Sequence, residues 1–326
     1  MGNPAEKVVT IPGRDRLDKE LCEALRLSRE QAKRLIVSGR IRIGGVTHHH
    51  PARRLGKPTP VEILEAPAIR PPSSPLPFDE AAVQIVFEDE WMLAVNKPSG
   101  LPVHPGAGHV HDTLVEWLRA KNIRLANAAD PSRAGLVHRL DKDTSGIILL
   151  AKEISVAENL MRQFSARTIE KEYRVVVQGC VPRRPITIIG AIARNPTDRK
   201  TFGIRRGGRD AVTVIEGISA VRTASYIRAM PKTGRTHQIR VHLKHAGFPI
   251  IGDPMYGVRN VPGISRMLLH AYRIKFSHPI TSAAMNLCAP LPDEFVVSLR
   301  LLGFSPADDD RPRPGDDIDS GDPGCV

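Results

Sequence analysis

Cysteine, aromatic residues and long apolar runs are all scarce in this sequence of 326 residues. The four cysteines lie far apart and form no CxxC pair, so the sequence predicts reduced thiols and excludes both a disulfide-stapled scaffold and a zinc site built on paired cysteines. Aromatic residues make up only 4% of the chain, which predicts an aliphatic core. No apolar run approaches the roughly 18 residues of a membrane span, and the start, MGNPAEKVVT, lacks the apolar region of a secretory signal. These absences predict a cytoplasmic protein that does not associate with a membrane.

Positive charge is abundant, because the formal net charge is +12. Residues 305–326 hold seven Asp and only two Arg, so the rest of the chain is more basic still. Such an excess indicates a polyanionic partner, and nucleic acid is a better candidate than a membrane surface. Composition alone fits equally well a basic protein that has no such partner.

Two segments without an apolar pattern divide the chain. The stretch PAIRPPSSPLPF has five prolines in twelve residues and predicts an extended linker. The C-terminal residues have few apolar side chains to bury and predict a disordered acidic tail. The predicted organisation is a flexible N-terminus at 1–13, a small domain at 14–66, a linker at 67–81, a large domain at 82–304 and the tail at 305–326.

The small domain combines helical and strand patterns. Leucines recur at every fourth residue from Leu17 to Leu25, which predicts one face of a helix, and Ser28 is placed to cap a second helix that stops at Gly39. The alternating stretch RIRIGGVTH predicts a β-hairpin with a Gly-Gly turn. The second helix has a basic face that would suit a phosphate backbone, although an ordinary solvated face explains the charge as well. Three histidines at 48–50 favour a polar loop over a metal site, since neighbouring side chains point in different directions.

The stretch GLVHRLDKDTSGIILLAK, residues 135–152, places charged residues between two apolar runs that predict buried strands. A loop held by two such strands is a rigid platform for Arg139 and Asp141. A carboxylate at such a position needs a cation nearby, because an unpaired buried charge is costly. Alone, the stretch supports two interpretations, a structural aspartate that caps a turn or a catalytic carboxylate.

Two neighbouring stretches predict further elements of the large domain. The run MLAVNKPSG predicts a strand and a turn, and Asp112 is placed to cap a helix that follows. The run KEYRVVVQG, rich in β-branched residues, predicts a strand that carries Tyr173. Taken alone, Tyr173 fits an aromatic of the core better than a functional residue.

The stretch TGRTHQIRVHLKHAGFPIIGDPMYG predicts a helix that is capped by Thr236 and ends near Gly247. Arg240 lies about one turn into this helix. The planar guanidinium of arginine binds both oxygens of a carboxylate, so Arg240 is the candidate partner of Asp141.

Together these stretches resemble a known family. NKPSGLPVHP, HRLDKDTSGIILLAK, EKEYRVVV and TGRTHQIRVHLKHAGFPIIGDPMYG, followed by LLHA at Leu268–Ala271, resemble the RluA-type pseudouridine synthases over nearly all of 83–304. The segment RLDKELCEALRLSREQAKRLIVSGRIRIGG resembles the alpha-L RNA-binding domain, which is named after a ribosomal small-subunit protein. The combination resembles the branch that acts on large-subunit ribosomal RNA. It implies an α+β fold with a mixed, mainly antiparallel sheet and flanking helices, preceded by a small α/β RNA-binding domain.

The resemblance implies that the protein isomerises uridine to pseudouridine in RNA, without a cofactor or a metal. The target base would leave the stack, as it does in other enzymes that act on a base. Asp141 would be the essential carboxylate, and the sequence leaves open whether it attacks the anomeric carbon or removes the ribose 2′ proton. The implied catalytic residues are Asp141, Tyr173 and Arg240, and the implied RNA contacts are His138, Arg139, Arg235, Arg29, Lys33, Arg34 and Arg40.

Ribosomal RNA is the expected substrate, transfer RNA stays open as an alternative, and a monomer is expected. A protein that only binds RNA would explain the charge and the small domain, but not the four matching motifs. A hydrolase needs two working carboxylates or a metal site, and the sequence contains no HExxH, no zinc spacing and no GxxxxGK loop. Two departures bear on substrate preference, namely Thr201-Phe202 within a basic loop and the acidic tail.

Overall fold

The computed structural model describes residues 5–25, 27, 29–64, 83–105, 112–126 and 131–305. Its contacts divide the chain into two compact units, Met1–Ser73 and Ser74–Val326. The predicted linker lies outside the described residues, and so does all of the predicted tail except Ser305. Within the described part of the chain, no helix has both the length and the apolar character that a membrane crossing requires.

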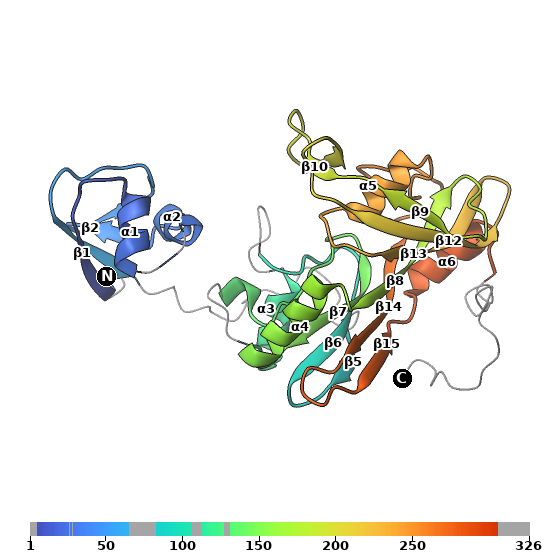
Figure 1. Ribbon diagram of the computed structural model, residues 1–326, viewed down its shortest axis with the longest axis horizontal. Coiled ribbons are helices and arrows are strands. Elements are labelled where there is room, and N and C mark those ends of the chain that lie inside the picture. The colour runs from blue at the N-terminus through green and yellow to red at the C-terminus, as the bar shows by residue number, and fades with distance from the viewer. Residues whose placement is uncertain are drawn as a thin grey trace. The chain divides into compact units, whose positions relative to one another are not determined.

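The N-terminal unit is a four-stranded sheet with two helices (Figure 1). Its strands have the order β1-β4-β2-β3, and the hairpin predicted around the Gly-Gly turn is confirmed as β2 and β3. Both turn glycines have positive φ, as a two-residue turn of this kind requires. The elements are β1 (Ala5–Ile11), α1 (Leu17–Leu25), α2 (Arg29–Val37), β2 (Ile41–Ile43), β3 (Val46–His48) and β4 (Thr59–Leu64).

The prediction of a flexible N-terminus at 1–13 is wrong for residues 5–11, because β1 pairs along the length of β4; residues 1–4 lie outside the described residues. The strand was missed because its alternation of side chains is short: Ile11 is fully buried and Val8 is exposed. The partner strand follows about fifty residues later, so local sequence gave no sign of the pairing. Ser28, the predicted cap of α2, lies outside the described residues.

The C-terminal unit is built on a nine-stranded sheet with the order β5-β6-β7-β14-β8-β13-β12-β9, in which β15 pairs with β14. Among the described strands of this sheet only β7 and β14 pair in parallel, so the predicted α+β class with a mixed, mainly antiparallel sheet is confirmed. The strands are β5 (Gln84–Glu88), β6 (Met92–Lys97), β7 (Ser145–Ala151), β8 (Glu170–Gln178), β9 (Ile186–Ile189), β12 (Val212–Ala220), β13 (Ala224–Pro231), β14 (Leu269–Ser277) and β15 (Ala284–Cys288), and β10 (Ile192–Arg194) and β11 (Phe202–Ile204) form a separate hairpin.

In the part of this unit that the structure describes, the sheet is covered by the helices α3 (Leu114–Ala120), α4 (Ile154–Ala166), α5 (Gln238–His245) and α6 (Asp293–Leu301). Helices α3 and α4 pack on β6 and β7 (Figure 1). Alternate residues of β8 contact different helices, since Val175 packs with α5 and Val176 packs with α6. Helices α5 and α6 therefore cover opposite faces of the β8–β13 half of the sheet.

Several local predictions need correction. The run Gly135–Val137 forms a single bridge to Leu150 instead of a strand, because it is short and begins at a glycine with positive φ. Thr113, not Asp112, caps α3, since its side chain accepts the N–H of Glu116. Helix α5 begins after His237, which is the cap in place of Thr236 and has left-handed backbone angles. For the two helices the cap moved by one residue while the element stayed.

Three of the four cysteines belong to the described residues, namely Cys22, Cys180 and Cys288. Cys22 and Cys180 are free, as predicted.

Candidate active site

The residues predicted for function in the large domain come together in one pocket with a volume of about 540 Å³. It lies between the loop before β7, the end of α4, the start of β8 and the start of α5. The predicted residues that line it are Asp141, Tyr173, Arg240, His138, Arg139 and Arg235. Sequence motifs that are up to a hundred residues apart thus share one cavity, with apolar walls and several basic residues.

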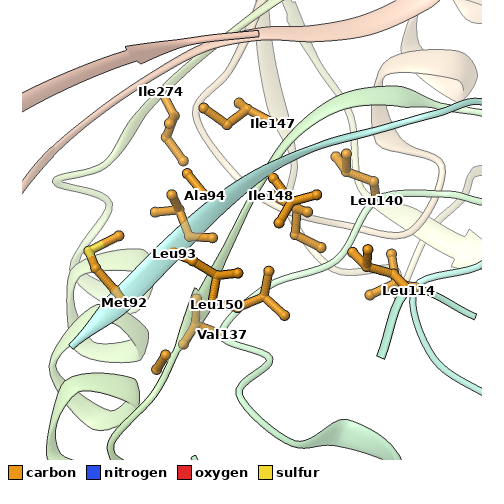
Figure 2. Close-up of a cluster of buried hydrophobic side chains, with 14 of the residues drawn as sticks. Met92, Leu93, Ala94, Leu114, Val137, Leu140, Ile147, Ile148, Leu150 and Ile274 are labelled. Carbon is orange, nitrogen blue, oxygen red and sulfur yellow. The ribbon is translucent and has the colours of Figure 1, made fainter. Parts of the chain in front are cut away.

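The loop that carries Asp141 is anchored in the largest apolar core of the protein. Val137 and Leu140 precede Asp141 and are both buried among side chains of β6, β7 and α3 (Figure 2). Asp141 itself remains 19% exposed at its side chain and faces the pocket. The burial of Val137 and Leu140 therefore holds the Asp141 carboxylate in place, although Gly135–Val137 does not form the predicted strand.

Lys97 at the end of β6 holds the same loop through hydrogen bonds to its backbone. Its side chain is fully buried, and its Nζ donates to the carbonyls of Pro98, Leu101 and Lys142 at 2.8, 2.8 and 2.9 Å. Burial lowers the pKa of Lys97 from 10.5 to about 7, since the charged form loses its water. Lys97 therefore ties the turn after β6 to the residue that follows Asp141.

Arg240 pairs with Asp141, as the sequence predicted, but it also pairs with a second carboxylate. Its Nη1 lies 3.1 Å from Asp141 Oδ2, while Nε and Nη2 donate to Asp253 at 2.8 Å each. Asp253 is fully buried, and it also accepts the backbone N–H groups of Met255 and Tyr256. The pKa of Arg240 is raised: burial acts to lower it, but Asp253 and Asp141 outweigh that effect. Asp253 thus holds the guanidinium in the orientation that faces Asp141.

Tyr173 lies where the two main apolar cores of this unit meet. Its neighbours in β8, Glu172 and Arg174, point to the opposite face, where they form a buried ion network with Arg228 and Glu216. Arg174 and Arg228 stand directly opposite each other in register, so the two glutamates are needed to offset like charges. This network fixes the register of β8 and with it the position of Tyr173. Burial, followed by the Asp141 charge, raises the pKa of Tyr173, so its hydroxyl stays protonated at neutral pH.

The three predicted RNA contacts in the pocket differ in their exposure and in their hydrogen bonds to the rest of the protein. His138 Nε2 accepts the N–H of Leu149 at 2.8 Å, and its ring lies 4.7 Å from the ring of Phe164. Arg235 donates from Nε to the carbonyl of Asp210 at 3.1 Å and lies half-buried. Arg139 is exposed at the pocket. Arg139 therefore presents the guanidinium that is most accessible to a substrate among these three.

Among the described residues that line the pocket, Asp141 is the only carboxylate. Asp253, the second carboxylate that contacts Arg240, is buried and paired, so the described lining of the pocket does not offer the pair of working acids that a glycosidase needs. The site offers one carboxylate with an arginine partner, a protonated phenol and a basic rim. This set suits a reaction at the sugar of an RNA nucleotide more than hydrolysis.

Comparisons with known proteins agree with this geometry. A family model described as RNA pseudouridylate synthase matches residues 92–245. The uncharacterized RNA pseudouridine synthase YlyB of Bacillus subtilis is 35% identical over 294 residues, which are 89% of this chain and 95% of that protein. The chain belongs to the RNA pseudouridine synthase family.

Further relatives of this synthase support the assignment. The ribosomal large subunit pseudouridine synthase D of Zymomonas mobilis is 35% identical over 303 residues, covering 89% of this chain and 94% of that protein. The solved structure of human RNA pseudouridylate synthase domain containing 4 superposes with a TM-score of 0.54 at 26% identity, covering 67% of this chain and 92% of that chain. The family predicted from the sequence motifs, and with it the prediction that the protein is an RNA-modifying enzyme, is confirmed.

The predicted RNA contacts of the N-terminal unit lie on or next to α2 of this synthase. Arg29 and Lys33 are exposed, although Arg29 Nε also lies 3.3 Å from buried Asp18. Arg34 belongs to α2, and its side chain is outside the described set. Arg40 donates from Nε and Nη2 to the carbonyl of Leu64, so its guanidinium also holds the end of β4. Within the described residues, no group of three or more His, Cys, Asp or Glu is arranged to hold a metal, the histidines at 48–50 included.

Sequence reasoning missed four residues of the site, namely Asp253, His237, Tyr256 and Lys97. Each lies in one of the stretches that resemble the family, but no local sequence pattern indicates which side chain it contacts. Asp253 begins the turn DPMYG, and a carboxylate before a proline suggested no more than a turn. His237 and Tyr256 meet only because α5 folds back on this turn, where the two side chains hydrogen-bond at 2.8 Å.

A buried hydrogen-bond chain holds the junction between β7 and β14 beneath the site. Arg266 Nη2 donates to Ser145 Oγ at 2.5 Å, Ser145 Oγ lies 2.8 Å from His270 Nδ1, and His270 Nε2 lies 3.0 Å from the carbonyl of Ala289. Gly146 follows Ser145, and a Cβ on it would lie 2.2 Å from the carbonyl oxygen of Ala271. The close approach of the two strands therefore requires a glycine in the TSG motif.

We expect the synthase to lose stability as the pH falls below about 6.5, because His270 and His138 are held neutral. Burial lowers the pKa of each from 6.5 to about 3. The unfolded chain takes up these protons between the two values and the folded chain does not, so stability falls with pH by about 1.4 kcal/mol per unit for each histidine. Urea denaturation at about pH 7.5, 6.5 and 5.5 measures this slope, because these values span the pKa of about 6.5 that histidine has in the unfolded chain.

The change His270→Gln removes one of the two buried histidines and should therefore reduce the slope of unfolding free energy against pH by up to about 1.4 kcal/mol per pH unit. His245→Gln, at an exposed position of α5, is the matched control and should leave the slope unchanged. A slope that is equal in wild type and His270→Gln would contradict the prediction.

Proposed function

We propose that this synthase isomerises specific uridines to pseudouridine in large-subunit ribosomal RNA, with Asp141 as the essential carboxylate. The observation that carries the proposal is the pocket in which Asp141 is the sole carboxylate among the described lining residues and faces Arg240 at 3.1 Å. The names of relatives such as the Zymomonas mobilis protein support large-subunit RNA as the substrate.

The target uridine leaves its stack and enters the pocket. Arg139, exposed beside Asp141, fills the gap left in the RNA. The uracil lies against Tyr173, where base stacking on an aromatic ring is worth about 1–3 kcal/mol. Arg235 and the other basic residues of the rim hold phosphates, and the ring edge of His138 contacts the nucleotide.

Asp141 then acts on the ribose in one of two ways. It attacks the anomeric carbon as the glycosidic bond breaks, or it removes the 2′ proton; in both cases the bond electrons leave with N1 of the uracil. The base rotates, and its ring carbon forms the new bond to C1′ as the bond to Asp141 breaks or as the 2′ carbon takes its proton back. The hydrogen on that ring carbon leaves as a proton, and N1 takes up one proton. A carboxylate nucleophile is reasonable beside an oxocarbenium-like centre. The protonated phenol of Tyr173 supports a stacking role more than proton removal at neutral pH. The chemistry requires no cofactor.

The test uses large-subunit ribosomal RNA that carries tritium on the uracil ring carbon that forms the new bond. Wild-type enzyme should release tritium from this RNA, because bond formation replaces the hydrogen at that carbon. Transfer RNA labelled in the same way serves as the alternative substrate. Release from transfer RNA alone would overturn the substrate assignment, and release from neither RNA would overturn the isomerisation itself.

The N-terminal unit is proposed to add non-specific affinity for RNA through α2. Removing residues 1–66 should weaken RNA binding and make it less dependent on salt. The slope of log affinity against log salt should become shallower by about 0.7–0.9 for each phosphate that the unit neutralises in the full-length enzyme. Lys33→Ala should account for one such phosphate, while Lys57→Ala, exposed elsewhere in the unit, should change nothing. Filter binding across a salt series measures the slopes, and equal slopes for Lys33→Ala and wild type would count against the role of α2.

The organisation of the whole chain is part of the proposal. The linker at 67–81 joins the RNA-binding unit to the catalytic unit, and the tail at 305–326 extends beyond it. The enzyme acts as a cytoplasmic monomer, which light scattering at working concentrations would test.

A further inference from the structure

His237 occupies a special position at the start of α5. Its backbone has φ 55°, in the left-handed region that few residues other than glycine adopt, although histidine is among those enriched there. Its ring lines the pocket, and its Nε2 lies 3.9 Å from Asp141 Oδ2. That distance is too long for a hydrogen bond, so Nε2 is not committed to Asp141. The ring edge is thus directed at the place where a substrate would meet the carboxylate.

The other ring nitrogen is held by Tyr256. His237 Nδ1 lies 2.8 Å from Tyr256 Oη, and Oη accepts the backbone N–H of Phe202 at 2.7 Å. Oη accepts this N–H with one lone pair and still has its O–H to donate, and Nδ1 is the acceptor within reach of that O–H. The proton of the neutral imidazole then lies on Nε2, where the negative charge of Asp141 also favours it. Burial lowers the pKa of His237 and raises the pKa of Tyr256, which keeps both groups neutral.

We propose that His237 is a further catalytic residue, which donates its Nε2–H to an oxygen of the flipped uracil beside Asp141. The inference rests on the proposed isomerisation. When the bond between C1′ and N1 breaks, its electron pair leaves with N1, and negative charge spreads to O2 and O4 of the detached base. A fixed neutral donor aimed at that charge stabilises it without giving up its proton. This role is the same for both possible actions of Asp141.

Tyr256 is a positioning residue in this scheme, and it also connects the site to the β10–β11 hairpin. Phe202 begins β11, and its ring lies 5.4 Å from the ring of His237. The guanidinium of Arg240 lies 5.0 Å from the ring of Tyr256. The Thr201-Phe202 pair, which departs from the usual pattern of the family, therefore lies next to the side chain that selects the tautomer of His237.

The tautomer can be measured without any turnover. Nitrogen-15 NMR of the wild-type enzyme near pH 7.5, above the ordinary histidine pKa of about 6.5, distinguishes Nε2–H from Nδ1–H, and the spectrum of His237→Asn assigns the signal. We expect the Nε2–H form at His237 and a mixture of the two forms in Tyr256→Phe. The Nδ1–H form in the wild type, or no change in Tyr256→Phe, would overturn the proposal.

Single-turnover tritium release tests the catalytic part. Asparagine suits the left-handed backbone but does not reach the position of Nε2, so His237→Asn should lower the rate about 10²–10³-fold, the usual effect of removing such a donor. His237→Gln restores an N–H near that position and should recover at least about tenfold of this loss. RNA affinity should stay within about threefold, and His245→Asn should match wild type, as distant surface changes do.

Equal rates for His237→Asn and wild type would overturn the role, and so would equal rates for the Asn and Gln variants. If wild type released no tritium from any RNA, the proposed isomerisation would fail, while the tautomer measurement would still decide the arrangement of His237. If the variants failed to fold, the wild-type spectrum and Tyr256→Phe would still decide it.

Discussion

Replacing Asp141 with asparagine is expected to lower the single-turnover rate of isomerisation by at least about 10⁴-fold, as loss of an essential nucleophile or base does. Asparagine keeps the size of the side chain and a hydrogen-bond acceptor for Arg240, so the fold should persist. Arg240 also keeps its two bonds to Asp253 in this variant. Tritium release from ribosomal RNA under enzyme excess measures the rate, and filter binding should show RNA affinity within about threefold of wild type.

Asp143→Asn is the matched control, because Asp143 lies two residues further along the same loop and does not line the pocket. Its rate should stay within about tenfold of wild type. Residual activity in Asp141→Asn equal to that of Asp143→Asn would remove Asp141 from the reaction and leave a protein that only binds RNA as the better interpretation.

Replacing Arg240 with methionine is expected to cost about 3–5 kcal/mol of stability, because it leaves Asp253 buried without its counter-charge. Asp253 is fully buried and receives two hydrogen bonds from Arg240 at 2.8 Å. The same change removes the cation that faces Asp141, so the rate should also fall. Urea denaturation measures the loss of stability, and Arg300→Met, at an exposed position of α6, should stay within about 0.5 kcal/mol of wild type.

The double variant Arg240→Met with Asp253→Asn separates the two roles of Arg240. It removes both charges of the buried pair, and the amide oxygen of asparagine can still accept the backbone N–H groups of Met255 and Tyr256, so most of the loss should be recovered. Catalysis should not recover, because Asp141 still lacks its partner. Recovery of the rate along with stability would show that Arg240 serves the fold alone.

The sequence predicted β7, β8 and α5, which carry much of the site, because their patterns are local and long enough. The β-branched run around Tyr173 predicted β8, and the apolar spacing around Arg240 predicted α5. The Arg240–Asp141 pair could be inferred because a carboxylate in a rigid loop requires a cation and arginine suits that role. The placement of these residues in one pocket follows from the order of the strands, which local patterns do not specify.

What could not be predicted depends on contacts between distant parts of the chain. Asp253 competes for the guanidinium of Arg240 only because the turn after α5 folds back on the helix. The start of α5 moved to His237 because the site holds that residue in a left-handed conformation, against its local preference. The strand at the N-terminus was missed for the same reason, since its partner β4 supplies the hydrogen bonds that make it a strand.

The place of β14 in the sheet has a consequence for the order in which the protein matures. This strand joins β7 to β8, and it begins at Leu269, after every residue assigned here to the chemistry has been translated. A growing chain that ends before β14 therefore carries Asp141, Tyr173, His237 and Arg240 but has no strand to hold the two halves of the sheet together. Pairing across more than a hundred residues is slow to form, so the pocket is completed late in synthesis. A truncated product of translation would keep the reactive groups and be unable to modify RNA.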